Sequence, residues 1–195
     1  MRYPDSIEKL IHKFSLLPGV GKKTAARYAY YIIENDRHFA LDFCEKIMEV
    51  KDKVKLCEVC FSLSENDLCF ICKTRSHDVI CVVGYPKDVA VLEKAGYNGA
   101  YHVLGGSLSP LEGRGADDLK IKELIKRLDD KTQEIIMALN PDVEGEATAL
   151  YLAKLIKPFD IRVSRLATGI SMGSDIEYAD EVTLSRAITQ RIVLN

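Results

Sequence analysis

The sequence predicts a multi-part α/β protein, in which a helical N-terminal region and a small cysteine-bearing insert precede a mainly parallel sheet with flanking helices. Three observations support this fold class. Residues 1–55 show helical periodicity, two Cys-x2-Cys pairs follow, and from residue 78 onward apolar strand-like runs alternate with helical patterns. We place the boundaries so that the parts are 1–55, 56–76, 77–172 and 173–195.

Composition and charge are those of an ordinary globular protein. The chain has 195 residues, 47% hydrophobic and 29% charged, with a net charge of −2. Residues 1–55 carry 11 Lys/Arg against 8 Asp/Glu, so we expect any phosphate-binding surface there. The longest apolar runs are too short to cross a bilayer, and the charged N-terminus lacks a signal-peptide stretch. We therefore expect a cytoplasmic protein with no membrane partner.

Three helices are predicted in the N-terminal part. The first has Ser6 as its cap and ends at the breakers LPGVG, and the others cover 22–33 and 39–54. Apolar residues recur at helical spacing in the first (Ile7, Leu10, Ile11, Phe14) and third (Phe39, Phe43, Ile47, Val50).

The turn between the first two helices predicts a phosphate-binding hairpin. Gly19 and Gly21 allow close backbone approach, and Lys22, Lys23 and Arg27 add positive charge to a helix N-terminus. Such a hairpin binds the backbone of single- or double-stranded DNA without sequence preference. A nucleotide P-loop is excluded because Leu16 stands at its first glycine position, whereas a plain helix–turn–helix packing element remains an alternative. The pattern apolar-Pro-Gly-apolar-Gly-Lys resembles the helix-hairpin-helix motif of DNA-repair proteins.

The cysteine insert predicts one structural zinc ion per chain. Its spacing is Cys57-x2-Cys60-x8-Cys69-x2-Cys72, which supplies four thiolates to one tetrahedral Zn²⁺ and leaves no position open for water or substrate. The remaining cysteines, Cys44 and Cys81, lie in helical and strand patterns, and we expect both to be buried core thiols.

The rest of the chain alternates between strands and helices. This order implies a mainly parallel sheet. The expected strands are 78–85, 100–106, 133–140 and 161–168, and the expected helices are 88–96, 117–130 and 144–159. A long Gly/Ser/Pro-rich loop covers 105–119, where Arg114 is a candidate contact to nucleotide or DNA and a solvated loop is the alternative.

Three carboxylates follow the expected strand 133–140. Asp142, Glu144 and Glu146 lie where ligands gather at the carboxyl ends of parallel strands, although an acid there also stabilises a helix N-terminus. Two-metal phosphodiester chemistry with Mg²⁺ needs a further acid from a second strand. The residue found at that position is Gly84, and Asp88 lies too far into the next helix to replace it. The sequence therefore predicts an incomplete acidic centre, at which any Mg²⁺ is not catalytic.

Taken in order, these parts resemble the RecR family of bacterial recombination mediators over essentially the whole chain. The matching stretches are LPGVGKKTAARYA, the four cysteines, YHVLGGSLSPLEGRG, NPDVEGEATALYLAKLIKP and GSDIEYADEVTLSRAI.

The resemblance implies a helix-hairpin-helix, a zinc finger, a Toprim domain and a C-terminal assembly segment, without enzymatic activity. It implies that RecO, or RecF in another complex, acts with the protein to place RecA on SSB-covered single-stranded DNA at gaps. It also implies homo-oligomers, from dimers to ring-like tetramers. Lys22, Lys23 and Arg27 would face DNA, and Asp142, Glu144 and Glu146 would recruit RecO or influence DNA binding.

Gly84 departs from the family's pattern, which has glutamate at this strand end. Nothing in the local sequence requires glycine, and we interpret Gly84 as a Glu→Gly replacement made to probe the acidic centre, although a natural loss would give the same sequence. Two other functions remain as alternatives: a Toprim-type metal-dependent nuclease, and a zinc-stapled scaffold that binds only protein.

Overall fold

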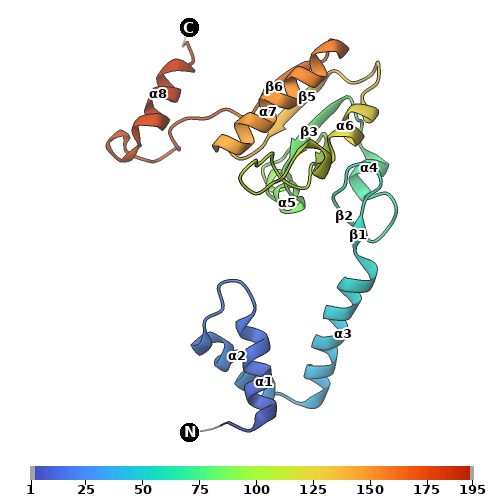
Figure 1. Cartoon of the computed structure of the whole chain (residues 1–195), viewed down its shortest axis with the longest axis vertical. Helices are drawn as coiled ribbons and strands as arrows, with labels where there is room; N and C mark the ends of the chain where they lie inside the picture. Colours follow the sequence, from blue (N-terminus) through green and yellow to red (C-terminus); the bar gives the residue numbers. More distant parts are fainter. Residues whose placement is uncertain (1–2, 194–195) are drawn as a thin grey trace. The chain divides into compact units, whose positions relative to one another are not determined.

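The structure is a computed structural model that describes residues 3–193. It divides into two compact units, Met1–Val54 and Lys55–Asn195, and Figure 1 labels their helices and strands. Among the described residues, no helix is long and apolar enough to cross a membrane.

The first unit contains three helices, α1 (Asp5–Ser15), α2 (Lys22–Glu34) and α3 (Arg37–Lys53). Helices α1 and α2 pack together over the fully buried Ala25 and Ala29, and the Phe14 ring meets Tyr28 edge-on. The predicted cap at Ser6 is wrong: α1 already begins at Asp5, with Pro4 at its N-cap. Proline is tolerated there because a residue ahead of the first helical turn needs no N–H for the intrahelical hydrogen bonds.

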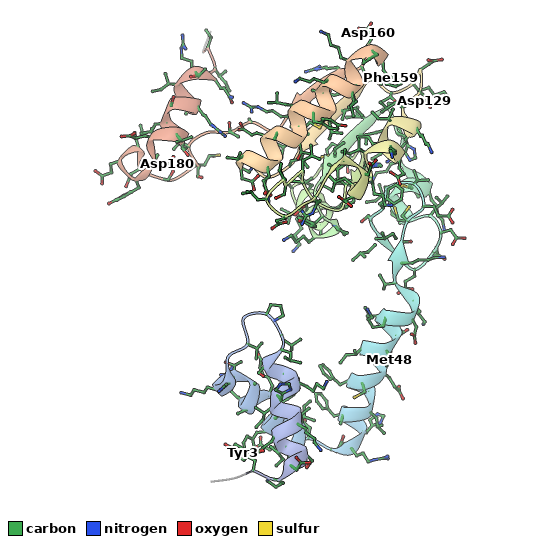
Figure 2. The ribbon with its side chains drawn as sticks, in the orientation of Figure 1. Tyr3, Met48, Asp129, Phe159, Asp160 and Asp180 are labelled. Atoms are coloured by element: carbon green, nitrogen blue, oxygen red, sulfur yellow. The ribbon has the colours of Figure 1, made fainter. Side chains whose placement is uncertain are left out.

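Helix α3 leaves its apolar face uncovered within the described residues. Asp36 caps its N-terminus by accepting a hydrogen bond from the Phe39 backbone N–H at 2.8 Å. Besides its charged side chains, this helix exposes five large apolar ones, among them Met48, which Figure 2 labels: Leu41, Phe43, Ile47, Met48 and Val50. The expectation that Cys44 is a core thiol is wrong, because it too is exposed on this helix.

The second unit is built on a parallel sheet of strand order β4-β3-β5-β6. The strands are β3 (Val79–Val83), β4 (Ala100–Val103), β5 (Glu134–Ala138) and β6 (Arg162–Arg165), with helices α5 (Pro86–Lys94), α6 (Ile121–Arg127) and α7 (Val143–Ile156) between them. The predicted α/β class and its strand–helix alternation are confirmed.

Two apolar clusters lie on opposite faces of this sheet. Alternation along β3 points Ile80 and Val82 to one face and Cys81 and Val83 to the other. Helices α6 and α7 cover the first face, and α5 covers the second (Figure 1). Cys81 is therefore a core thiol, as the sequence predicted.

The remaining elements flank the sheet. Strands β1 (Lys55–Leu56) and β2 (Leu63–Ser64) pair antiparallel, and α4 (Phe70–Thr74) follows them; near the C-terminus lies α8 (Glu181–Thr189). The helix expected over 117–130 is shorter, because Asp118 accepts a hydrogen bond from the Gly115 N–H and holds a 3-10 turn at Ala116–Asp118 before α6 begins.

Helix α7 offers a matched test of this core. Leu152 is fully buried, whereas Leu150 is 65% exposed. Leu152→Ala should lower the free energy of unfolding by about 2–5 kcal/mol, since it removes buried methyl groups and leaves a cavity. Leu150→Ala, with the same change in helix propensity, should cost less than about 0.5 kcal/mol. Urea unfolding followed by circular dichroism measures both, and equal losses would contradict the packing described.

Candidate functional site

The hairpin of the first unit presents a positively charged helix N-terminus. After α1 the chain turns through Gly19, whose φ of +75° favours glycine, and Gly21 becomes the N-cap of α2. The first turn of α2 has no acidic residue, and no side chain caps its N–H groups. Lys22, Lys23 and Arg27 are exposed around it. This arrangement can hold a phosphate group through backbone N–H groups and lysine charges.

The four predicted zinc ligands lie together. The sulfur atoms of Cys57, Cys60, Cys69 and Cys72 are all within 4.8 Å of one another, which suits one ion. Backbone N–H groups also point at sulfur: Cys69 N donates to Cys57 Sγ at 3.3 Å and Cys72 N to Cys69 Sγ at 3.4 Å. These donors stabilise thiolates, so the residues present fit a tetrahedral zinc ion.

The pKa values of the cysteine thiols also indicate that the cluster needs a metal ion. Hydrogen bonding from Cys72 lowers the pKa of the Cys60 thiol to about 5, whereas hydrogen bonding to Cys60 and burial raise the pKa of Cys72. One thiolate thus forms easily and makes the next harder to form. A dication is needed to hold all four sulfurs as thiolates.

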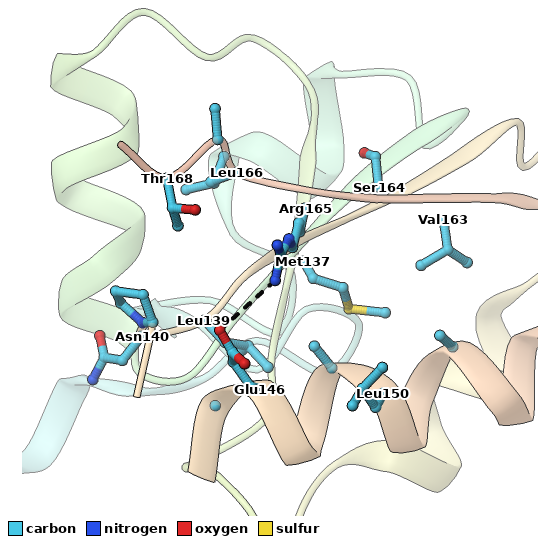
Figure 3. Close-up of a pocket in the computed structure, with 15 residues that line it drawn as sticks. Met137, Leu139, Asn140, Glu146, Leu150, Val163, Ser164, Arg165, Leu166 and Thr168 are labelled. Carbon is cyan, nitrogen blue, oxygen red and sulfur yellow. Dashed lines mark ion pairs between the residues drawn. The ribbon is translucent and has the colours of Figure 1, made fainter. Parts of the chain in front are cut away.

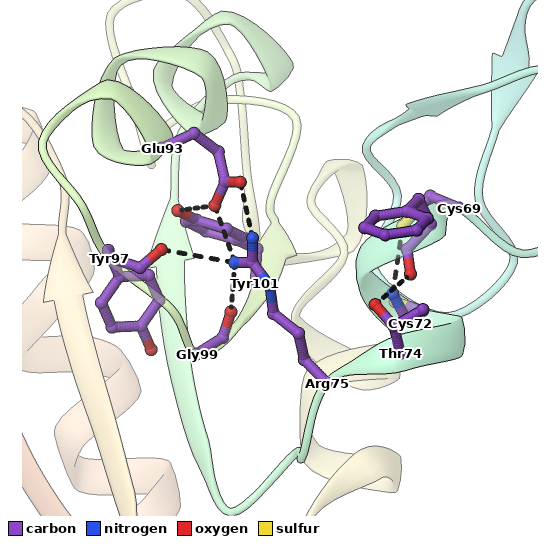
Figure 4. A network of polar contacts seen from close by, with 9 residues as sticks. Cys69, Cys72, Thr74, Arg75, Glu93, Tyr97, Gly99 and Tyr101 are labelled. Atoms are coloured by element: carbon purple, nitrogen blue, oxygen red, sulfur yellow. Dashed lines mark hydrogen bonds and ion pairs between the residues drawn. The ribbon is translucent and has the colours of Figure 1, made fainter.

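An ion-paired arginine anchors the cysteine segment to the sheet. Arg75, directly after α4, makes a two-pronged contact with Glu93 of α5 at 2.8 and 2.7 Å (Figure 4). The same guanidinium donates to the backbone carbonyls of Tyr97 and Gly99, and Glu93 accepts a further hydrogen bond from the Tyr101 hydroxyl. These contacts fix the end of α4 against α5 and β4.

The three predicted carboxylates engage three different partners. Asp142 caps α7 by accepting from the Gly145 N–H at 2.7 Å, and Glu144 accepts from the Ser109 hydroxyl. Glu146 pairs with Arg186 of α8 at 2.8 Å and lies 3.7 Å from Arg165 (Figure 3). Among residues 3–193, the four cysteines form the only metal-ligating group of three or more side chains. The carboxylates are therefore not assembled around a common ion position.

Gly84 lies where the missing acid was expected, at the end of β3 beside the end of β5. The register pairs Val83 with Ala138, so the two strands end together. Its backbone is held, since Gly84 O accepts from the Gly105 N–H at 3.0 Å. A Cβ at this position would lie 3.7 Å from Asp88 Oδ2 and 3.9 Å from the Gly106 carbonyl, which are ordinary contacts. The fold therefore accepts a side chain here, and the origin of the glycine stays a prediction.

Arg114 in the 105–119 loop is held by the protein itself. It pairs with Glu112 at 2.7 Å, approaches the Tyr85 hydroxyl at 3.4 Å and lies against Gly106. Its guanidinium thus supports the loop's own structure, and its contact to nucleotide or DNA stays a prediction.

Comparison with protein-family models covers nearly all of the described chain. The RecR helix-hairpin-helix model matches residues 7–51, the RecR four-cysteine zinc finger model 54–73, a Toprim domain model 78–167 and the RecR C-terminal model 169–192.

The chain belongs to the RecR family.

Family membership and geometry agree on the cysteine segment. The match to the RecR zinc finger model coincides with four sulfurs close enough to share one ion, so the segment is a structural zinc site with one zinc per chain. Zinc, when bound, supplies the charge that holds four thiolates together in a segment with few other buried residues.

Sequence reasoning missed the partners of the acidic residues. Ser109, Arg165 and Arg186 contact Glu144 or Glu146 from other elements of this RecR-family fold. No local pattern indicates these pairs, because the partners lie 19 to 40 positions away in the sequence. A groove of about 490 Å³ was also not predicted; it is largely apolar and is lined by β5, α7, β6 and the segment to Thr168 (Figure 3).

Loss of one ligand should empty the zinc site. Cys69→Ser should bring the zinc content of the purified chain well below one ion per chain, because three thiolates hold Zn²⁺ less tightly than four. Cys44→Ser is the matched control, since Cys44 is exposed and distant in sequence from the cluster, and it should keep one zinc. Elemental analysis after gel filtration gives both values, and full zinc occupancy in Cys69→Ser would contradict the ligand set.

Two glycines at the strand ends should respond oppositely to alanine. Gly84→Ala should leave the free energy of unfolding unchanged or raise it by up to about 1 kcal/mol, because the backbone accepts a Cβ and the unfolded chain loses freedom. Gly106→Ala should cost roughly 1–3 kcal/mol, since its φ of +152° strains any L side chain. Thermal and urea unfolding measure the two variants side by side. A loss in Gly84→Ala as large as in Gly106→Ala would show that β3 ends differently.

Proposed function

We propose that this chain is a non-catalytic mediator of recombinational DNA repair. It binds single- and double-stranded DNA without sequence preference and, with RecO or RecF, helps load RecA onto SSB-coated single-stranded DNA at gaps. It works in the bacterial cytoplasm, at the nucleoid during repair. The recombinational role itself follows from membership of the RecR family.

The observation that carries the DNA-binding proposal is the uncapped N-terminus of α2. Lys22, Lys23 and Arg27 surround it, and its first turn contains no acid to compete with a phosphate. The backbone N–H groups carry partial positive charge and contact phosphate rather than bases. Binding of this kind is nonspecific and weakens steeply as salt rises.

The acidic residues support a role in assembly more than in catalysis. Asp142, Glu144 and Glu146 engage separate protein partners, and Gly84 supplies no acid from β3. We therefore assign these three carboxylates to contacts with RecO, or to an influence on DNA binding, as parts of the Toprim edge. Any Mg²⁺ bound there serves no catalytic step in this proposal.

Self-association is the second part of the proposal. The exposed apolar face of α3 and exposed apolar residues of the C-terminal segment, among them Ile176, Tyr178 and Ile188, suit burial against other copies of the chain. We infer a homo-oligomer, from a dimer to a ring-like tetramer. The four-part division at 1–55, 56–76, 77–172 and 173–195 belongs to this proposal as well.

Neutralising the hairpin should weaken DNA binding. The triple variant Lys22→Gln, Lys23→Gln and Arg27→Gln should bind a single-stranded oligonucleotide more weakly and lower the slope of log Kobs against log salt by about 2. The control removes three charges from α3 instead: Lys46→Gln, Lys51→Gln and Lys53→Gln. Fluorescence anisotropy with and without RecO, beside the solution mass, measures each chain.

The outcomes separate the proposal from its alternatives. Unchanged affinity and salt slope in the hairpin variant would show that the hairpin does not bind DNA. Absence of DNA affinity in the unchanged chain at low salt would favour a scaffold that binds only protein. Mg²⁺-dependent nicking of DNA by Gly84→Glu, abolished by Asp142→Asn, would favour a nuclease.

A further inference from the structure

A half-buried arginine of the sheet unit has buried donors that no described residue satisfies. Arg127 is the last residue of α6, and its Nη1 donates a hydrogen bond to the Tyr101 carbonyl of β4. Its Nε and Nη2 are buried and have no hydrogen-bond partner within residues 3–193. A buried donor without a partner costs free energy, and a buried cation without an anion costs far more. The side chain therefore needs a nearby negative charge.

The unpaired edge of β4 brings Arg127 next to the zinc finger. Leu104 N donates to the Val83 carbonyl of β3. The backbone N–H and C=O groups of residues 102 and 104 therefore point towards β3, and those of Tyr101 and Val103 point to the free edge of the sheet. On that edge Val103 N donates to the Cys60 carbonyl at 2.8 Å. The two anchor residues, Tyr101 and Val103, are two positions apart, so their Cα atoms lie roughly 7 Å apart along a strand. Arg127 and the first zinc knuckle thus dock side by side on one strand.

The charge of the loaded zinc site is the counterpart of the guanidinium. Four thiolates and one Zn²⁺ carry a net charge of −2 in a largely buried position. Burial lowers the pKa of Arg127, and the charges of Cys72, Cys60, Cys57 and Cys69 raise it again. Negative charge on the cysteines of the finger, which docks on the same strand as Arg127, therefore favours the protonated form of Arg127.

Two other cations near the finger, Arg75 and Lys120, have carboxylate partners of their own. Arg75 is neutralised by Glu93, and Lys120, whose ammonium lies over the Phe61 ring, pairs with Glu123 at 3.3 Å. The neighbouring histidines add no competing charge at neutral pH. These are His77 and His102. Burial is the main cause that lowers the pKa of each, to about 4 for His102, and the charge of Arg127 lowers it further. No carboxylate of the described chain forms an ion pair with Arg127.

We propose that Arg127 is the counter-charge of the zinc–thiolate centre. As a positioning residue, it stabilises the doubly negative Zn(Cys)4 group from the side of the sheet. Zinc retention is thereby linked to docking of the finger on β4. The alternative is that Arg127 only donates a hydrogen bond to Tyr101, for which positive charge is unnecessary. Partners outside the ligand set commonly change metal affinity by about 10–100-fold when removed.

Zinc competition against a chromogenic chelator tests the proposal on the full chain. Arg127→Gln should lower zinc affinity by about 10–100-fold, whereas Arg127→Lys, which keeps the charge, should stay close to the unchanged chain. Arg127→Met keeps the aliphatic volume and should lose affinity as Arg127→Gln does. Arg162→Gln on the opposite edge strand β6 is the control, and it should retain wild-type affinity.

A second readout uses the Co²⁺-loaded chain. Loss of a positive charge beside the thiolates should shift the sulfur-to-cobalt charge-transfer absorption in Arg127→Gln and leave it in place in Arg127→Lys. Unchanged zinc affinity and an unchanged cobalt spectrum in Arg127→Gln, with only a lower melting temperature, would overturn the proposal. So would a Lys variant that loses zinc as readily as the Gln variant. If the uncharged variants fail to fold with zinc while Arg127→Lys folds and retains it, the requirement for charge is supported.

Discussion

Four cysteine sulfurs within 4.8 Å of one another are stable as thiolates only around a dication, and much of the second unit depends on that constraint. Apart from Ser62, the fully buried residues of the segment from β1 to α4 are cysteines, so apolar packing alone cannot hold it. With the knuckle fixed, the Cys60 carbonyl meets Val103 N, and Phe61 and Ile71 pack on the cluster formed by β3, β4 and α5. An exposed parallel edge strand is thereby covered rather than left open to pairing with another chain.

At the carboxyl ends of β3 and β5, the acidic residues make structural contacts within the chain. Parallel neighbours bring Gly84 beside the start of the acidic segment, as the topology requires. Each acid makes such a contact. Asp142 caps α7, Glu144 accepts a hydrogen bond from Ser109 of the 105–119 loop, and Glu146 forms an ion pair with Arg186 of α8. Chemistry belongs to the arrangement of side chains rather than to the fold, and here each carboxylate has a protein partner.

Local patterns predicted what depends on local chemistry. Strand–helix alternation gave the parallel sheet, the spacing of Cys57, Cys60, Cys69 and Cys72 gave the zinc site, and the glycine turn gave the hairpin. Contacts between distant segments were not predictable, because neither periodicity nor spacing encodes which side chains meet across elements. No sequence pattern distinguishes Arg127 from the other basic residues, and Cys44 was predicted to be a core thiol because it lies in a helical pattern. The burial of Arg127 depends on β4, against which it docks, and Cys44 is exposed because no described part of the chain packs over it.

The exposed apolar surfaces connect the fold to the proposed binding mode. A single hairpin with three cations makes few phosphate contacts, and its affinity at physiological salt is expected to be weak. Covering the α3 face with other copies of the chain would place several hairpins in one particle. Binding of one hairpin then raises the effective concentration of the next, and affinity rises without any new type of contact. In the proposed oligomer, apolar residues that are costly to expose on one chain, such as Phe43 and Ile47, would strengthen a weak and nonspecific DNA contact by joining several hairpins.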